Sequence, residues 1–405
     1  MKRAAKSAGV VAGELINGGQ LSVLLLALLV QGSTGLIQLA GYADFRGVDY
    51  VSFTSHFIVG ALVANVLCLN TEALILSGKI SGSGYRLLLF CGILGLVLSG
   101  VEPILLSSSV PSSALFACWF FCSRMFLALF ARVAPSPRVI IPCGVALVAL
   151  FFLRAGIFFN VACYLSTLLA VAAVIARRIV VEDKGLTLSL WASLRTFAGY
   201  IPHTAAGFIL SYSDRYAVIH FHPTSAAEAY LRIAQLASLA AFGVFPIVYA
   251  IRTKIINMSR VPTDMAIALM SATIAVGIGI AFVGAFFFVE VILVKRSLSE
   301  VPVAPAFVLA MVSAAAFAQM YQAFSMRIFM TNNYGFINRG TIVGALLSLA
   351  VAAIAIGLDS AVSWISLVPL VGWALVYFRV IWFFRRERMG AANAVDDEVP
   401  SRERY

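Results

Sequence analysis

Apolar stretches as long as a membrane helix recur along the whole chain, from Val10 to Phe384, with only short polar breaks between them. A spanning helix needs about 20 mostly apolar residues. Inside hydrocarbon every backbone amide must be bonded within its own segment, and the period-two alternation of barrel strands is not seen. The pattern predicts an all-α, polytopic integral membrane protein with about twelve spans. The predicted spans are residues 11–38, 51–76, 87–106, 112–131, 138–153, 156–176, 190–212, 226–251, 265–289, 303–326, 337–357 and 361–384.

The first apolar segment begins with basic residues, as a signal peptide does. It has no A-x-A cleavage site, and eleven similar segments follow it. We therefore expect it to be the first retained span.

Composition agrees with this interpretation, because 61% of the 405 residues are hydrophobic and 12% are charged, against roughly 25% charged in a soluble domain.

The net charge of +11 would suggest nucleic-acid binding in a soluble protein. Here we expect no such partner, because the basic residues divide unequally between alternate loops. One side holds Lys2, Arg3, Lys6, Lys79, Arg86, Arg132, Arg138, Arg177, Arg178, Lys184, Arg252, Lys254, Arg260, Arg327, Arg339, Arg385, Arg386 and Arg388. The other holds Arg46, Arg154, Arg215, Lys295 and Arg296. The positive-inside rule then places both termini in the cytoplasm, and the basic excess also attracts anionic membrane lipids.

All six cysteines lie inside apolar segments, at positions 68, 91, 118, 122, 143 and 163. Cys118 and Cys122 are four residues apart on one helix, a spacing that a metal pair can use. Small buried thiols are the favoured interpretation, so we expect neither disulfides nor a metal site.

The longest charged connection, ARRIVVEDKG at 176–185, divides the spans into six and six. We predict an N-terminal lobe at 1–180, a C-terminal lobe at 181–384 and a cytoplasmic polar tail at 385–405. The two lobes are expected to surround a central cavity, and an even number of spans in each half gives both the same orientation, as in parallel-repeat transporters. A faint internal likeness joins GYADFRGVDY (41–50) and HPTSAAEAY (222–230), because each leads through an acidic residue to a tyrosine.

Ionisable residues inside spans are the candidates for function, because a charge at mid-membrane costs at least about 2.5 to 3.5 kcal/mol. Arg124 is surrounded by apolar residues, far from both ends of its span. It is a candidate for a cavity-facing phosphate contact or, alternatively, for a structural pairing. Glu228, Arg232 and Gln235 share one helix face at i, i+4 and i+7. They either line the exit half of a cavity or form an ion pair near the outer interface.

Other polar positions are secondary candidates. Arg195 and Arg379 both lie close enough to the cytoplasmic ends of their spans to snorkel. Arg195 and His203 also lie close to Pro202 on the seventh span, where a kink can shape a cavity, so both are candidates to line it. Glu14, Asn17 and Glu72 are candidates for a coupling ion, with interfacial solvation as the alternative. Gln319 and Gln322 either bond sugar hydroxyls or link helices.

The stretch 199–250 carries a family resemblance, through Pro202, the run Ser211, Ser213, Asp214, Arg215 and Tyr216, then Tyr230 and LASL at Leu236 to Leu239. It resembles the central region of the Wzx polysaccharide flippases of the multidrug/oligosaccharidyl-lipid/polysaccharide exporter superfamily. The chain departs from that family at Glu228 and Ala229, where a glycine is usual near the tyrosine. It is also too short for the two additional terminal helices that some members carry.

The resemblance implies two six-helix lobes in the bacterial inner membrane. It implies that undecaprenyl-diphosphate-linked oligosaccharide moves from the cytoplasmic to the outer leaflet for O-antigen, capsule or exopolysaccharide synthesis. Candidate partners are a polysaccharide polymerase and a chain-length regulator, and no cofactor is implied.

Two other classes remain open. A drug or cation antiporter of the same superfamily would place acidic residues deep in the N-terminal half. A membrane enzyme such as a polymerase, ligase or acyltransferase would need larger outer loops or clustered catalytic groups. His56, His203, His220 and His222 form no nucleophile or metal pattern, so the chain is predicted not to be an enzyme.

The topology is tested with reporter fusions. Because of the lysine and arginine distribution, we expect cytoplasmic signals at Gly82, Pro135, Lys184, Met258 and Gly390, and outer signals at Gly47, Ser108, Pro223 and Ser299. Opposite signals at both Lys184 and Pro223 would exclude the twelve-span arrangement.

Overall fold

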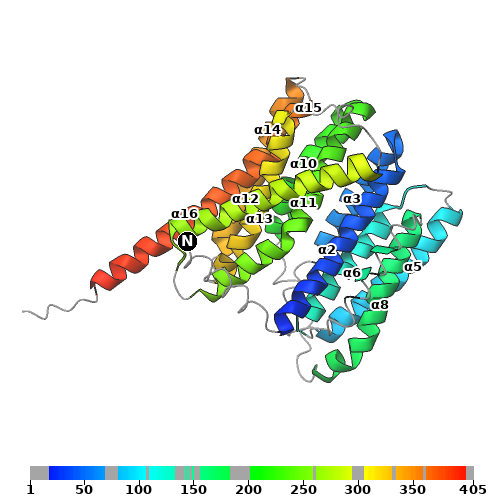
Figure 1. The fold of residues 1–405 in the computed structure, drawn as a ribbon, viewed down its shortest axis with the longest axis horizontal. Coiled ribbons are helices and arrows are strands. Elements are labelled where there is room, and N and C mark those ends of the chain that lie inside the picture. The colour runs from blue at the N-terminus through cyan, green and yellow to red at the C-terminus, as the bar shows by residue number, and fades with distance from the viewer. Residues whose placement is uncertain are drawn as a thin grey trace, which may run out of the picture. The chain divides into compact units, whose positions relative to one another are not determined.

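The computed structural model describes residues 18–68, 81–105, 109–132, 141, 144–145, 148–149, 156–182, 201–258, 261–293, 305–330, 334–358 and 362–397. All regular structure among these residues is helical, as the sequence predicts (Figure 1). The helices are α2 (Gly18–Asp44), α3 (Gly47–Cys68), α5 (Ser81–Leu105), α6 (Ser113–Arg132), α8 (Ile157–Glu182), α10 (Ile201–Phe221), α11 (Thr224–Asn257), α12 (Asp264–Phe286), α13 (Pro305–Met330), α14 (Tyr334–Gly357), α15 (Val362–Ile365) and α16 (Leu367–Asp397). α12 continues directly into a π-helix, η1 (Phe287–Leu293).

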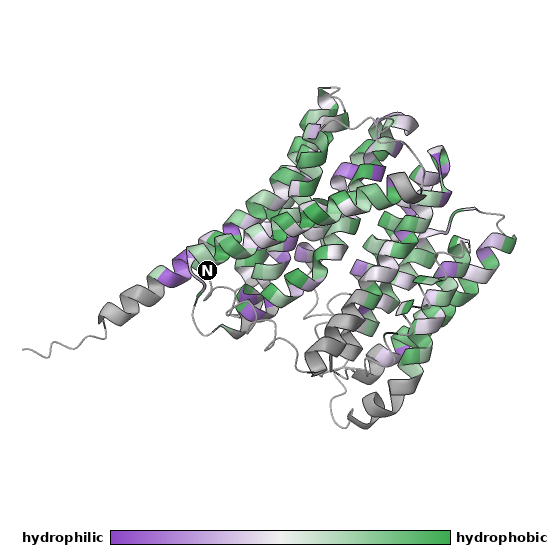
Figure 2. Ribbon diagram, in the orientation of Figure 1, coloured by the Kyte–Doolittle hydropathy of each residue, from purple (hydrophilic) through white to green (hydrophobic). Residues whose placement is uncertain are grey.

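The residues on the exposed face of α12 indicate whether lipid or water surrounds this helix. One stripe, Ile267, Ser271, Ile274, Ile278 and Phe282, is buried. The opposite stripe is almost equally apolar, yet Met265, Leu269, Val276, Ile280 and Val283 are each at least 60% exposed. A surface helix of a soluble protein would carry polar residues there. Hydrophobic residues cover most of the described helices in Figure 2.

Seven helices are long and apolar enough to cross a membrane, judged over the described residues alone. They are α3, α5, α11, α12 with the start of η1, α13, α14 and α16. Two shorter apolar segments, Ser113–Phe126 and Ile157–Ala173, lie in α6 and α8. The multi-pass helical prediction is therefore confirmed, while the count of twelve spans in two lobes stays a prediction.

The chain groups into two compact units. The first unit contains Met1–Phe208, Arg215–Gln235 and Phe288–Glu300, and the second contains Ile209–Asp214, Leu236–Phe287 and Val301–Tyr405. α10 and α11 each contribute residues to both units. The lobe division at residue 180 stays a prediction.

In the first unit α6 packs against α3, α5 and α8. Aromatic rings fill the contacts: Phe57 of α3 lies 4.9 Å from Phe120, and Trp119 lies 5.6 Å from Tyr164 of α8, measured between ring centroids. These aromatic pairs provide large apolar area in edge-to-face and tilted geometries.

α6 and α8 run parallel. On α5, Gly92 lies against Leu169 and Gly95 against Leu165, so α8 runs antiparallel to α5. Gly95 also lies against Cys118, and the Cys122 thiol is 3.6 Å from the carbonyl of Leu88, so α6 is antiparallel to α5 as well.

Because α6 and α8 run in the same direction, the chain that joins them must return to the side on which α6 begins. The predicted span at 138–153 falls in that connection. The residues described there, 141, 144–145 and 148–149, are helical.

In the second unit the direction of the helices alternates. α14 and α16 are antiparallel, with Phe336 against Phe383, Gly340 against Arg379 and Gly344 against Val376. α12 is antiparallel to α16 through Ser271, whose hydroxyl is 2.7 Å from that of Tyr377. α13 is parallel to α16, because Phe317 meets Tyr377 and Phe324 meets Phe384. The last four predicted spans therefore alternate in direction as expected.

One predicted boundary is wrong. The sequence predicts a seventh span that ends at residue 212. α10 continues to Phe221, so Asp214 and Arg215 lie within the helix, and Asp214 is 1% exposed.

The described cysteines agree with the prediction of small thiols. Cys68, Cys118 and Cys122 are buried, and Cys91 and Cys163 are half-buried. Cys143 lies outside the described residues. Among the residues described, no three potential metal ligands cluster.

Gly372 allows α16 to lie directly on α14. A methyl group there would overlap the Ser348 hydroxyl and approach Leu210 and the Gly344 carbonyl. We expect Gly372→Ala to destabilise the protein by about 1 to 3 kcal/mol through overpacking, seen as a lower melting temperature of the detergent-solubilised chain. Gly279→Ala on α12 is the control, since its methyl group would meet open space. Equal melting temperatures for the two variants would contradict the close approach.

Candidate functional site

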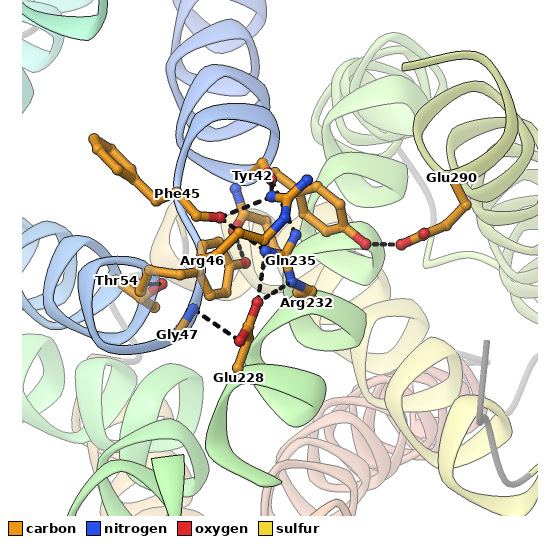
Figure 3. A network of polar contacts seen from close by, with 10 residues as sticks. Tyr42, Phe45, Arg46, Gly47, Thr54, Glu228, Arg232, Gln235 and Glu290 are labelled. Carbon is orange, nitrogen blue, oxygen red and sulfur yellow. Dashed lines mark hydrogen bonds and ion pairs between the residues drawn. The ribbon is translucent and has the colours of Figure 1, made fainter. Parts of the chain in front are cut away.

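A buried polar network joins α2, α3, α11 and η1 within the first unit (Figure 3). The predicted face of α11, Glu228, Arg232 and Gln235, forms its centre. All three side chains point toward the turn between α2 and α3. The structure thus brings together residues that the sequence placed on one face and adds partners that the sequence did not indicate.

Arg232 closes the C-terminal end of α2. Its Nη1 and Nη2 donate to the carbonyls of Tyr42 and Phe45, each at 2.9 Å. These are among the last carbonyls of the helix, which have no intrahelical donor and carry the negative end of the helix dipole. The guanidinium carbon also lies 4.5 Å from the ring centroid of Tyr42 and 4.4 Å from that of Tyr50. A cation close to aromatic rings gains further electrostatic stabilisation.

Glu228 neutralises this arginine. Its Oε1 accepts from Arg232 Nε at 2.9 Å and lies 2.7 Å from Nη2. Its Oε2 accepts from the backbone N–H of Gly47 at 2.9 Å. Gly47 begins α3 with φ = +55°, a left-handed conformation that glycine adopts without steric cost. The carboxylate therefore fixes the turn that leads into α3.

Gln235 extends the network toward both neighbouring helices. Its Oε1 accepts from the Tyr50 hydroxyl at 2.5 Å, and its Nε2 donates to the carbonyl of Gln38 at 2.5 Å. The Tyr42 hydroxyl donates to Glu290 of η1. Four chain segments are thus tied by charged or polar bonds in a region where Tyr42 and Tyr50 are fully buried.

The network contains charges of both signs. Arg46 also donates to the carbonyls of Tyr42 and Phe45, at 2.8 Å each. Glu228 and Glu290 are its carboxyl groups. Arg232 is 5% exposed, and its three kinds of N–H group bond protein oxygens. This geometry supports the structural alternative for Arg232, as a residue that holds helix ends.

Arg124 has a different environment. It is half-buried in α6, eleven residues after Ser113 and eight before Arg132, which places it about 16 Å and 12 Å from the two ends at 1.5 Å per residue. On the described helices of the first unit, every acidic residue lies within about two turns of a helix end. These residues are Asp44, Asp49, Glu102, Glu182, Glu228 and Glu290. Among the described residues of the first unit, no carboxylate therefore lies at a mid-helix position like that of Arg124.

Glu102, the nearest of these carboxylates to α6 in sequence, already has partners. It accepts from the Ser112 N–H at 2.9 Å and from the Ser112 hydroxyl at 2.5 Å. It therefore ties the end of α5 to the start of α6.

The remaining predicted residues are distributed as follows. His203 is half-buried near the start of α10. Gln319 is buried on α13 and Gln322 is exposed, both in the second unit. Glu14, Asn17, Glu72 and Arg195 lie outside the described residues. None of these positions is tested as a site, and each stays a prediction.

Sequence reasoning missed Tyr42, Gln38 and Glu290. Glu290 had a signal, because it is a lone carboxylate at the end of a long apolar run. π-helical turns of the kind it occupies occur frequently at functional positions. Tyr50 and Tyr230, noted as tyrosines that open two helices, are 0% and 1% exposed. Nothing in local sequence indicated that Tyr42 would meet a residue almost 250 positions later.

The chain matches no protein-family profile and no curated protein. Among solved structures it is similar to a eukaryotic MATE transporter, with 12% identity, a TM-score of 0.44 and coverage of 93% of this chain and 99% of that one. It is also similar to a multidrug resistance MATE family transporter of the MOP superfamily in an outward-facing conformation, with 12% identity, a TM-score of 0.39 and coverage of 94% and 98%. Both TM-scores lie below 0.5, so neither likeness identifies the family.

Arg232 and Glu228 should be energetically coupled. We expect Arg232→Ala to destabilise the protein by about 1 to 3 kcal/mol, because it leaves the half-buried Glu228 carboxylate without its arginine and removes one of the two arginines that donate to the Tyr42 and Phe45 carbonyls. Glu228→Ala should cost less, since Arg232 keeps its carbonyl partners. The double variant should be no less stable than Arg232→Ala alone. Thermal unfolding of the solubilised proteins measures all three, and additive losses would show that the residues act independently.

Proposed function

We propose that this chain is a flippase that moves undecaprenyl-diphosphate-linked oligosaccharide from the cytoplasmic to the outer leaflet of a bacterial inner membrane. The transported units would serve O-antigen, capsule or exopolysaccharide synthesis. The Wzx-like run within residues 199–250 supports this choice. The structural observation that carries it is Arg124, a guanidinium in the middle of an apolar helix of the first unit, whose described carboxylates all lie near helix ends.

The physical argument starts from the cost of Arg124. A mid-membrane arginine persists where it faces water, finds a partner or reaches the interface. The last option is difficult about two turns from the nearer helix end, and the carboxylates of the described first unit lie near helix ends. We propose that Arg124 faces a wet path and meets an anionic substrate there. A guanidinium suits a diphosphate because its planar fork makes bidentate bonds and it stays protonated.

Arg232 has a supporting role in this proposal. Its N–H groups bond Glu228 and the end of α2. It positions the turn between α2 and α3, and Arg124 is the deep substrate contact. This assignment separates a binding arginine from a positioning arginine.

A drug or cation antiporter is the second candidate. The observation that favours it is Glu290, a carboxylate that is 2% exposed and accepts from Tyr42. Intramembrane carboxylates commonly mark ion pathways. The two functions differ in their cargo, so the same deletion strain distinguishes them.

The test is complementation of a deletion strain with Arg124 variants. Deletion should leave lipid-linked repeat units on the cytoplasmic leaflet and remove surface polysaccharide. Arg124→Lys keeps the charge without the bidentate fork, so it should restore part of the polysaccharide output, whereas Arg124→Ala and Arg124→Glu should restore little. Output is measured on extracted surface polysaccharide, with the amount of membrane-inserted protein measured in parallel.

Arg86→Ala is the matched control, because Arg86 is an exposed arginine near the start of α5. It should restore full output. Wild-type output from a well-inserted Arg124→Ala protein would remove the deep contact. Normal surface polysaccharide in the deletion strain, combined with increased drug or cation sensitivity, would favour the antiporter.

A further inference from the structure

A cluster of arginines and aromatic rings lies between α14 and α16 in the second unit, and the proposed flippase function makes no use of it. The rings of Phe336 and Trp382 stack with centroids 5.8 Å apart and an interplanar angle of 15°. Phe383 adds a third ring, 5.1 Å from Phe336. Arg379 lies over Phe336 at 4.7 Å, and Arg386 over Trp382 at 5.7 Å.

Helical spacing explains why these side chains meet. Arg379, Trp382, Phe383 and Arg386 occupy positions i, i+3, i+4 and i+7 of α16, which is a single helix face. On α14, Phe336, Arg339 and Gly340 share a face at i, i+3 and i+4. Gly340 lies against the Arg379 side chain. Three guanidinium groups therefore gather at one end of the α14 and α16 pair.

Carboxylates are distributed quite differently around this end of α16. On another face, Arg385 and Arg388 both pair with Asp264, at 3.3 and 2.5 Å. Arg327 has Glu387 at 3.6 Å and donates to the Met258 carbonyl at 3.0 Å. The α14 sequence contains no acidic residue at all. Within the described part of the chain, the positive charge of this face has no ion-pair partner.

Stacking on Trp382 leaves the guanidinium edges of the exposed Arg386 available, whereas Arg379 is half-buried. A guanidinium that lies flat on a ring directs its N–H groups outward in its own plane. The Arg379 Nε is buried and has no hydrogen-bond partner among the described residues. Arg339 and Arg386 are exposed, and Trp382 is 51% exposed. A ligand can therefore approach this face.

We propose that this face binds the phosphate of an anionic phospholipid headgroup, held by Arg379 and Arg386 with Arg339 beside them. A planar fork matches phosphate oxygens in bidentate geometry. Tryptophan is enriched at the headgroup level of membranes, and Trp382 lies within the cluster. The neighbouring exposed Phe378, one helical turn before Trp382, provides an apolar surface for the acyl chains. The sequence predicts this end to be cytoplasmic, and there Arg379 binds lipid phosphate rather than merely reaching toward water.

The experiment measures lipid binding by the purified full chain in detergent, using native mass spectrometry. The probes are phosphatidylglycerol and phosphatidylcholine with identical acyl chains. We expect preferential retention of phosphatidylglycerol by the wild type. Arg379→Gln/Arg386→Gln should weaken that binding on the order of fivefold per arginine and leave phosphatidylcholine unchanged. Arg386→Gln alone, at an exposed position, should show the single-residue loss without risk to folding.

Arg385→Gln/Arg388→Gln is the matched control, because it removes the same formal charge from the face that pairs with Asp264. It should retain most of the phosphatidylglycerol binding. Equal losses in both double variants would overturn the site in favour of a diffuse electrostatic attraction. Displacement of the lipid by micromolar inorganic phosphate would overturn the lipid assignment, since it would identify a site for free phosphate. Thermal unfolding of each variant verifies that the protein assayed is folded.

Discussion

The cost of an uncompensated charge away from water governs the arrangement of polar residues in this protein. In the first unit, carboxylates and arginines near the ends of α2, α3 and α11 pair with one another. They also bond backbone N–H and carbonyl groups at the helix ends. Arg232 achieves both at once, because its planar group bonds two carbonyls and one carboxylate, and its guanidinium carbon also lies 4.5 Å and 4.4 Å from the ring centroids of Tyr42 and Tyr50. A lysine has no planar fork to make this set of contacts.

The same constraint separates two kinds of arginine in the first unit. Arg232 is a buried cation whose N–H groups bond protein oxygens. Arg124 lies in the middle of a helix, away from the acidic residues of its unit. The surroundings of these two arginines differ because the described carboxylates of the unit are concentrated at the helix ends. An arginine at a helix end and one at mid-helix therefore have different neighbours, even when the local sequences are similarly apolar.

In the second unit the two faces of α16 show a comparable division. One face pairs Arg385 and Arg388 with Asp264 and thereby holds the start of α12. The face toward α14 combines arginines with aromatic rings and has no carboxylate. In the first arrangement, the arginine charges pair with a carboxylate of the protein itself. The second leaves Arg339 and Arg386 exposed and the buried Nε of Arg379 without a hydrogen-bond partner among the described residues.

The amino-acid sequence by itself determined the helical class, the approximate segments and the face shared by Glu228, Arg232 and Gln235. These properties depend on local hydrophobicity and on the 3.6-residue period, both of which can be read along the chain. Only the tertiary structure decided what those residues contact. The pairing of Tyr42 with Glu290 joins positions 248 residues apart, and the bonds from Arg232 to the end of α2 span almost 190. Such partners follow from helix packing, in which local periodicity specifies the buried face but leaves open which distant helix covers it.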